Sequence, residues 1–544
     1  MKGLNMAVIA PQTDVFLLHV PLEINDINQL TFASSAKQLE YFNSLEKIEL
    51  TNFIYQRKDN TVRVGGNFDE LLSYNYMMYR NSAYSDKWFF AYITGMEYLN
   101  DNVTAVSIKT DTFQTWQFDL TYKPVFVERE HVNDDTFGLH TLPENLETGE
   151  FVRALTGNEC SYSDNFWLVF QVTELISNMA DAGTGTHRLY NGIYSGLKTV
   201  LIDNYDTADL LVAAYDDAGK ADSIISCFYI PKGTVTSYVT NSGCVLHGST
   251  CTIYFPNATT SANTIDTLTV TRPTTIDGYT PKNNKLFTGE FCYMLASNNS
   301  GSEAIFHYED FRNPSSGNIE TPSFTVRSTL SQGGNVKLFP DNFYKAPKGT
   351  ASYTSFKSVA KYGITGGKLP ICSWNSDYYT NWLTQNAVNI GFSVAGTVGS
   401  AVGSLATGNI GGAVSSVFNG VAENVTRSYQ ASLVPDQAKG NTNCGDINFS
   451  EGLHLTVTTM NVRKEIAEVI DNYFTMFGYK VSRVKLPNIT GRRNWNYVKT
   501  VGCYIEGNIP QDDLAEIKEM FDRGVTFWHN PATFADYSQN NDII

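Results

Sequence analysis

The chain has 544 residues, of which 55 are acidic and 39 basic, so its formal net charge is −16. This balance excludes an outer surface built to hold nucleic acid, because phosphate contacts need clustered Lys and Arg. It leaves open a channel through which DNA slides, where weak adhesion is an advantage. The length predicts three or more domains, and the 31 Tyr and 32 Phe favour β-structure with extensive contact surfaces.

Residues 1–140 are predicted to form an N-terminal β-rich domain. The segment Phe68–Tyr79 is expected to be a helix, because Asp69 and Glu70 lie in its first turn. Short strands bounded by Gly and Asn turn residues are expected at 53–56, 61–64, 88–94 and 103–108.

Residues 141–375 lose helical periodicity and are predicted to form a β-rich middle region of one or two domains with long loops. Residues 234–275 are a run of Thr, Ser and Asn around short apolar pairs. Two apolar stretches, 324–327 and 336–339, flank Gln332-Gly-Gly-Asn and predict a β-hairpin.

Residues 376–447 are predicted to form a long uncharged loop with its flanks. Between Asp377 and Glu423 there is no Asp, Glu, Lys, Arg or His, and Gly, Ala and Ser alternate with Val. Gly at i and i+4 lets helix backbones approach closely in lipid. Ala387–Leu405 as a helix would span roughly 28 Å, close to the thickness of a bilayer core.

This loop is predicted to be membrane-active or to fill a lumen, although Gly/Ser-rich runs are also typical of flexible linkers. Its first arm alternates at the strand period, whereas its second arm follows the helical period. Insertion of one copy is marginal, so several copies in a ring are needed. The candidate membrane-active residues are Val388, Ile390, Phe392, Val394, Val398, Gly399, Val402, Gly403, Leu405, Gly408, Ile410, Gly412, Val414, Val417, Phe418 and Val421.

Residues 448–544 are predicted to form a C-terminal α/β domain. The expected order is strand, helix, strand, strand, helix, strand, with the first strand at 453–458 and the last at 525–528. Gly524 closes the second helix. This order matches the ferredoxin-like βαββαβ arrangement. The fold class is therefore mostly β with α+β parts, in a multidomain chain.

The sequence contains no pattern typical of an enzyme. Glu128 and Glu130 would share one face of a strand, a poor geometry for carboxylates that must flank a sugar, and a solvated or subunit-contact cluster is favoured. His131 and the other seven histidines show no metal-ligand spacing. We therefore expect no catalytic residue, no metal and no cofactor.

Eight cysteines are scattered without a Cys-x-x-Cys pair, which predicts free and mostly buried thiols. Pro11 interrupts the N-terminal apolar run too early for a secretory signal, so synthesis in the cytoplasm is expected. One basic concentration, with Trp495 and Tyr497 interleaved, could contact DNA phosphates, but a subunit contact is favoured. Its members are Lys480, Arg483, Lys485, Arg492 and Arg493.

Motifs near both ends resemble the tail-knob (distal tail tube) proteins of small picovirus-type short-tailed phages. The middle, 141–370, is not matched by motif, and the uncharged loop lies where that family carries a long hydrophobic loop. The motifs are Asn81–Tyr92, Asp111–Asp119 and Phe126–Val132 near the N-terminus, and Phe477–Asn488, Asn496–Thr500 and Phe521–His529 near the C-terminus.

The resemblance implies a virion protein that forms a homohexameric tube at the distal end of the tail, where it meets other tail proteins. Double-stranded DNA would pass through the tube, and six hydrophobic loops would plug the lumen and then form a pore in the host membrane. Two other functions are considered. A receptor-binding adhesin would use the Thr/Ser/Asn-rich middle region, and a cell-wall hydrolase would need a catalytic constellation.

Overall fold

The structure is a computed structural model that describes residues 12–53, 60–82, 87–160, 166–179, 189–190, 193–194, 196–257, 263–313, 315–330, 335–344, 362–367, 369–373, 441–443 and 454–544. The chain divides into two compact units. Unit 1 draws on residues 1–150, 275–291 and 462–544, and unit 2 draws on residues 151–274 and 292–461. Each unit therefore combines segments that are distant in sequence, whereas the sequence pattern predicts domains of consecutive residues.

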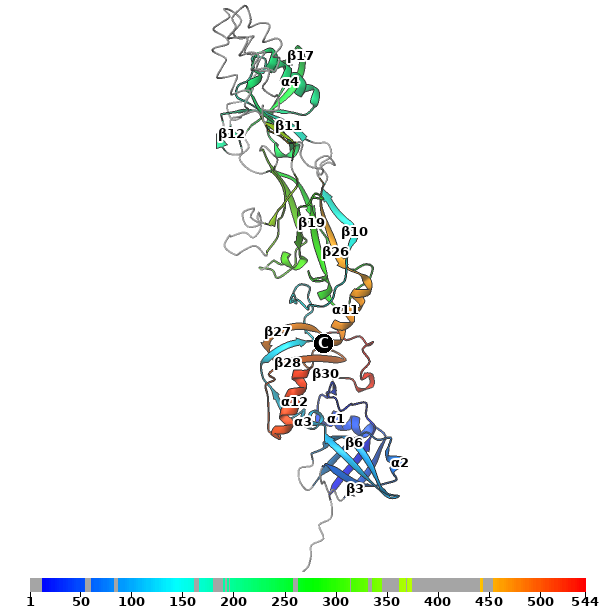
Figure 1. Ribbon diagram of the computed structural model, residues 1–544. Helices are drawn as coiled ribbons and strands as arrows, with labels where there is room; N and C mark the ends of the chain where they lie inside the picture. The colour runs from blue at the N-terminus through cyan, green and yellow to red at the C-terminus, as the bar shows by residue number, and fades with distance from the viewer. Residues whose placement is uncertain are drawn as a thin grey trace, which may run out of the picture. The chain divides into compact units, whose positions relative to one another are not determined.

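The N-terminal part of unit 1 is an antiparallel sheet in the order β3-β1-β5-β6-β7-β4 (Figure 1). Helices α1 (Ser35–Ser44) and α2 (Phe68–Leu71) accompany it. The strands predicted at 61–64, 88–94 and 103–108 are confirmed as β4, β6 and β7. The strands are β1 (Thr13–Leu18), β3 (Lys47–Phe53), β4 (Thr61–Gly65), β5 (Tyr76–Asn81), β6 (Phe89–Asn100) and β7 (Val103–Thr110).

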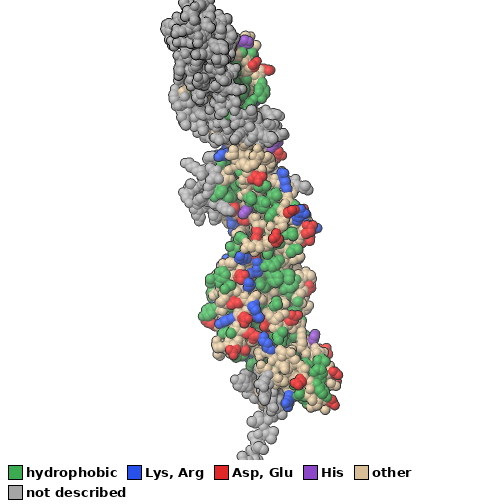
Figure 2. Space-filling model, viewed as in Figure 1, with side chains coloured by type: hydrophobic (Ala, Val, Ile, Leu, Met, Phe, Trp, Pro, Cys, Tyr) green, Lys and Arg blue, Asp and Glu red, His purple; other side chains and the backbone are tan. Residues whose placement is uncertain are grey.

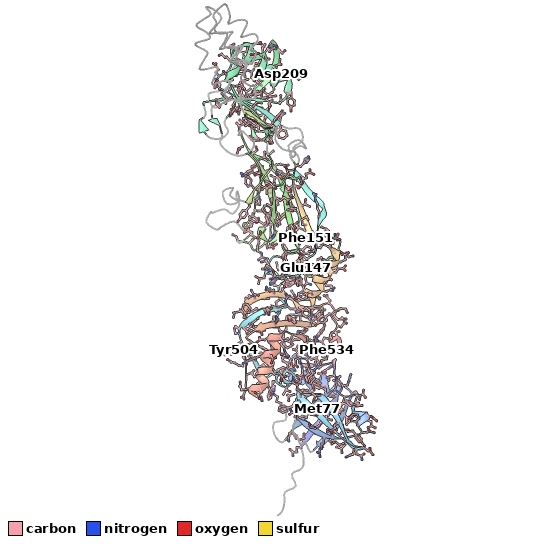
Figure 3. The ribbon with its side chains drawn as sticks, in the orientation of Figure 1. Met77, Glu147, Phe151, Asp209, Tyr504 and Phe534 are labelled. Carbon is pink, nitrogen blue, oxygen red and sulfur yellow. The ribbon has the colours of Figure 1, made fainter. Side chains whose placement is uncertain are left out.

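The predicted helix at 68–79 is wrong beyond Leu71, because β5 begins at Tyr76. Tyr76 and Met78 belong to one buried cluster of the sheet, and Met77, labelled in Figure 3, belongs to another. A strand with both faces covered reads as a continuous apolar run, which periodicity alone does not separate from a buried helix.

The second part of unit 1 is a five-stranded sheet in the order β2-β30-β28-β9-β27. Helices α3 (Thr112–Trp116), α11 (Lys464–Phe477) and α12 (Gln511–Arg523) belong to this part, with the short pair β8 (Leu120–Tyr122) and β29 (Ile505–Gly507). The strands are β2 (Asn28–Leu30), β30 (Val525–Trp528), β28 (Trp495–Val501), β9 (Val125–Glu130) and β27 (Tyr479–Lys485).

The predicted ferredoxin-like sheet is not what forms. The expected first strand, 453–458, overlaps β26 (Leu455–Val462), which pairs in another sheet with β19 (Cys292–Ser297). Instead, β28 and β30 pair directly with each other, and β9 lies between β27 and β28. The element order was correct, but strand pairing is decided by partners more than 150 residues away.

Helices α11 and α12 lie on opposite sides of this sheet (Figure 1). On the α12 side, Leu514, Ile517 and Phe521 share an apolar cluster with Val498 and Phe527. On the other side the indole N–H of Trp495 donates to the Thr475 carbonyl of α11 at 3.1 Å. The sheet is therefore covered on both faces over part of its length.

Unit 2 consists mainly of three β-sheets. The predicted hairpin is confirmed as β21 and β22, paired from Phe324↔Pro340 to Thr329↔Asn335.

The short strands β12 (Leu189–Tyr190) and β13 (Ile193–Tyr194) form a separate pair. The first sheet contains β10 (Phe151–Cys160), β26, β19 and β20 (Glu303–Phe306). The second contains β16 (Tyr238–Leu246), β17 (Ser249–Pro256), β14 (Lys198–Ile202), β11 (Phe166–Val172), β15 (Ile224–Pro231), β24 (Ile371–Ser373) and β25 (Asn441–Asn443). The third contains β18 (Asn263–Thr269), β21 (Ser323–Thr329), β22 (Asn335–Pro340) and β23 (Ile364–Thr365).

One helix of unit 2 was missed by the sequence analysis. Helix α4 (Tyr205–Asp217) starts after Asn204, whose side chain accepts from the Thr207 N–H at 2.8 Å. Leu211 and Tyr215 bury its apolar side in the main cluster of this unit. The N-cap residue and the apolar spacing were present in the sequence, within a region otherwise dominated by strands.

Candidate functional site

The sixteen candidate membrane-active residues, from Val388 to Val421, lie outside the described residues. Among the helices that are described, none is both long and apolar enough to cross a bilayer. The other candidate group, the basic residues near the C-terminus, is described in full and belongs to unit 1.

The five basic residues do not form an array of free cations. Lys480, Arg483 and Lys485 lie on β27, and the ammonium of Lys485 pairs with Glu130 of β9. Arg492 is held before β28, where its guanidinium donates to the Asn541 carbonyl at 3.2 Å and burial lowers its pKa. Arg483 and Arg493 are exposed. Lys485 is therefore paired within its own chain, and the role of the other four as DNA or subunit contacts stays a prediction.

Glu130 and His131 are buried, so the prediction of a solvated cluster is wrong for both. Glu130 also accepts from the Asn488 N–H at 2.9 Å, in addition to its pair with Lys485. Glu128, by contrast, stays half exposed and pairs with Lys499 at 2.9 Å. Since the register of β9 shifts beside Glu128, the two carboxylates do not share one environment.

The buried, neutral imidazole of His131 links β28 and α11 through two hydrogen bonds. Its Nδ1 accepts from the Tyr497 N–H at 2.7 Å, which leaves Nε2 to donate to the Thr475 carbonyl at 3.0 Å. Burial, with the nearby guanidinium groups of Arg492 and Arg129, lowers the pKa of His131 to about 3. These contacts give the imidazole a structural role.

The densest ionic group of unit 1 centres on Glu144, whose side chain is fully buried. Its carboxylate pairs with Lys285 and Arg129 and accepts from the Lys480 N–H at 2.9 Å. Lys285 is itself only 1% exposed at its side chain, and burial lowers its pKa. Arg129 also donates to the Gly478 carbonyl at 2.7 Å. The group therefore joins three segments that are distant in sequence.

Asp471 of α11 binds the segment 275–291, to which Lys285 also belongs. Its carboxylate accepts from the Tyr279 hydroxyl at 2.7 Å, the Lys282 N–H at 2.8 Å and the Asn283 N–H at 3.1 Å. The Asn283 side chain adds a bond to the same carboxylate at 2.9 Å. Buried carboxylates with this many donors are structural anchors. Sequence reasoning missed Glu144, Lys285 and Asp471, because no local pattern marks residues whose partners lie elsewhere in the chain.

Charge on the viewed face of the molecule is mixed, with basic and acidic side chains interspersed among apolar ones (Figure 2). Within the described residues there is no group of three or more His, Cys, Asp or Glu side chains that could hold a metal ion. Four of the described cysteines are buried: Cys160, Cys244, Cys292 and Cys503.

Comparison with known proteins gives two matching family models. Residues 254–542 match the C-terminal domain of the tail knob protein gp9 of Bacillus phage phi29. Residues 11–121 match the N-terminus of the caudoviral major tail protein. The first match covers the uncharged loop and all of the C-terminal sheet except β2 and β9.

Full-length relatives agree with these models. The chain is 25% identical to the tail knob protein gp9 of Bacillus phage phi29, over 100% of this chain and 99% of the relative. It is 24% identical to the tail knob protein gp9 of Bacillus phage PZA, with the same coverage. A solved structure, the tail knob protein gp12 of bacteriophage C1, has a similar fold, with a TM-score of 0.63 at 15% identity over 98% of this chain and 100% of that one. These relatives are tail components, which confirms the expectation that the chain is not an enzyme.

Proposed function

Because this chain belongs to the family of phage tail knob proteins, we propose that six copies form a tube at the distal end of the tail through which the genome leaves the virion. As a tail component the protein acts with other tail proteins. The net charge of −16 favours this role, because an acidic lumen does not retain DNA.

The uncharged segment between Asp377 and Glu423 is the observation on which the second half of the proposal depends. Six such segments would plug the lumen before ejection, since an apolar run of this length is an aggregation hazard when exposed. After release, the apolar residues of each arm would face lipid and the Gly residues would pack arm against arm. One segment alone would insert only marginally, whereas six segments that insert together would hold one another in the bilayer.

The tube is tested by electron microscopy of the purified protein. Class averages showing a sixfold ring with a central hole support it, as does a sedimenting species of six chains. A chain that stays monomeric at every concentration, including with other tail proteins added, contradicts it.

The loop is tested by dye release from liposomes over a pH series. Replacing Val398 and Val402 by Asp adds about 2.5–3.5 kcal/mol per residue to the free energy of insertion, which abolishes release while assembly persists. A control replaces Val469, 67% exposed on α11, by Asp and should release dye as the unmodified chain does. Equal release by all three proteins, or none from any while infection proceeds, would leave the segment as a plug only.

A further inference from the structure

Two cysteines of unit 2 face each other across a β-hairpin. Strands β16 and β17 are joined by His247 and Gly248, whose φ values of 44° and 78° are both positive, as a type I′ turn requires. In the register of this hairpin Cys244 is the direct partner of Cys251. Directly opposed residues of antiparallel strands have Cα atoms about 4.5–5.5 Å apart, which lies within the roughly 4.4–6.8 Å that a disulfide spans. The backbone therefore holds the two cysteines at a separation that a disulfide can bridge.

Both side chains project from the same face of the hairpin. Cys244 belongs to the buried apolar cluster that includes Leu211 and Tyr215 of α4, and Cys251 packs against that cluster. Helix α4 lies beside β17 (Figure 1). Both cysteines are thiols in the structure. The Sγ of Cys251 donates to the carbonyl oxygen of Cys244 at 3.5 Å, so this sulfur already reaches the neighbouring strand.

The hairpin can supply the remaining approach. Opposed Cβ atoms lie about 4.5–5.5 Å apart, and a disulfide needs about 3.5–4.5 Å. Among the described strands β16 has a neighbour on one side only, because it stands at the edge of its sheet. Its register with β17 shifts between Asn241 and Cys244, as at a β-bulge, and a Cβ added to Gly243 would meet nothing within 4 Å. Cys244 can therefore move toward Cys251 without disturbing the centre of the sheet.

We propose that Cys244 and Cys251 form a disulfide in an oxidising environment, and that this bond fastens the edge strand β16 to β17. The chain belongs to a family of tail components, and disulfides persist on virion surfaces, whereas thiols in the cytoplasm are kept reduced. An edge strand is a template for pairing with other chains, and the bond holds β16 on its own partner instead. The proposal depends on neither the hexamer nor the pore.

The reaction needs a disulfide oxidant of low molecular weight, such as oxidised glutathione, and the two thiols differ in how readily they react with it. Cys244 is 1% exposed, whereas Cys251 is only partly buried. Burial and the neighbouring Cys251 raise the pKa of Cys244 to about 12, whereas the contact with Cys244 opposes the rise that burial causes in the pKa of Cys251. Cys251 therefore loses its proton more readily and attacks first.

The bond forms in two exchange steps. In the first step the Cys251 thiolate attacks one sulfur of the oxidant, whose S–S bond breaks and releases one thiolate. In the second step Cys244 gives up its proton and attacks the Sγ of Cys251, which releases the second thiolate. The two cysteines are oxidised, and the oxidant takes up their two electrons and two protons as a pair of thiols. The second step is the slower one, because Cys244 is the less acidic thiol.

A metal ion is a poorer interpretation of this pair of cysteines. Metals bind thiolates, whereas burial favours the protonated form of both thiols. Among the residues that the structure describes, no group of three or more His, Cys, Asp or Glu side chains could hold a metal ion. The neighbouring His247 pairs with Asp217 at 2.5 Å instead. Two thiols alone do not complete a metal site, but they are sufficient for a disulfide.

Peptide mapping of the full chain tests for the bond. Trypsin cleaves after Lys232 and Lys282 but not between Arg272 and Pro273, so both cysteines lie in one peptide that holds no other cysteine. The reduced chain is incubated with oxidised glutathione, alkylated and digested without a reductant. We expect this peptide to resist alkylation and to be lighter by two hydrogen atoms than its reduced form. Alkylation of both cysteines, or attachment of either one to glutathione or to another cysteine, would overturn the proposal.

Two variants serve as controls for the mapping. Cys251→Ala removes one partner, so no peptide lighter by two hydrogen atoms should appear. Cys292→Ala removes a buried cysteine of another sheet of unit 2 and should leave the bond intact. Loss of the bond in both variants would contradict the local pairing. A count of thiols does not replace the mapping, because Cys227 lies opposite Cys372 in the register of β15 and β24.

Hydrogen exchange tests what the bond does. The oxidised unmodified chain is compared with the same chain after reduction, so no substitution is involved. Backbone amides of β16 should exchange about tenfold or more slowly in the oxidised chain, because a closed loop has fewer open states, and amides of β19 should exchange equally in both. Equal exchange in β16 would refute the fastening of the edge strand. Neither assay measures assembly or dye release, so failure here is distinct from failure of the proposed hexamer or pore.

Discussion

Replacing Glu144 by Gln should be among the most damaging single changes in unit 1. The carboxylate is fully buried and neutralises Lys285, whose side chain is 1% exposed, and Arg129, whose side chain is 11% exposed. Gln keeps the shape but removes the charge, so an ammonium is left buried without its counter-charge. Breaking a buried pair in this way costs about 3–5 kcal/mol. That is a large part of the roughly 5–15 kcal/mol by which a protein is stable.

The matched control is Glu150→Gln in the same unit. Glu150 pairs with Arg463 at 2.9 Å, but the two side chains are 82% and 54% exposed. Solvent-exposed pairs contribute about 0–1 kcal/mol, so this change should alter the free energy of unfolding very little. The double variant Glu144→Gln with Lys285→Met removes the stranded ammonium and should recover part of the loss.

The assay is urea unfolding at fixed protein concentration, with hydrogen exchange of peptides from β9 and β27 reporting on unit 1. We expect the Glu144→Gln midpoint to fall well below that of Glu150→Gln, and the double variant to lie between them. If the double variant is as unstable as Glu144→Gln, the loss does not come from an uncompensated charge. If Glu144→Gln is as stable as the control, the buried ionic group around Glu144 contributes little to the free energy of unfolding.

Two further predictions concern unit 1. Burial lowers the pKa of His131 to about 3 and of His529 to about 4, so below pH 6.5 the unfolded chain binds protons that the folded chain does not, and stability falls as the pH falls. Each histidine should lower the free energy of unfolding by about 2 kcal/mol between pH 7 and pH 5, and Asp111, whose pKa burial raises to about 6, should partly offset this loss. Urea unfolding at the two pH values should show a smaller change in stability for His131→Gln than for the unmodified chain. An equal change would refute the assignment to His131. Gly478 has φ 65°, and an added Cβ would lie 2.1 Å from the Glu130 carbonyl oxygen, whereas Gly502 has φ 67° and open space around it. Thermal unfolding should therefore show a several-fold larger loss of stability for Gly478→Ala than for Gly502→Ala. Similar losses would show that the backbone moves aside easily.

The sequence by itself determined the features that depend on local pattern and composition. The strands β4, β6 and β7, the β21–β22 hairpin, both C-terminal helices and the Gly524 terminus follow from alternation, turn residues and helical spacing, which are properties of neighbouring residues. The net charge and the uncharged segment likewise need no structure. The motifs at the two ends carried enough information to indicate the tail knob family.

Only the tertiary structure decided which segments pair. Nothing near β26 shows that it joins β19 and leaves the C-terminal sheet to β9, because a strand's partner depends on chain closure over hundreds of residues. The ionic group around Glu144 could not be predicted for the same reason, because Lys285 and Arg129 come from different segments of the chain. Burial also separated Glu130 and His131 from the solvated cluster that a charged run predicts. Both lie inside unit 1, because His131 contacts α11 and Glu130 contacts the loop after β27.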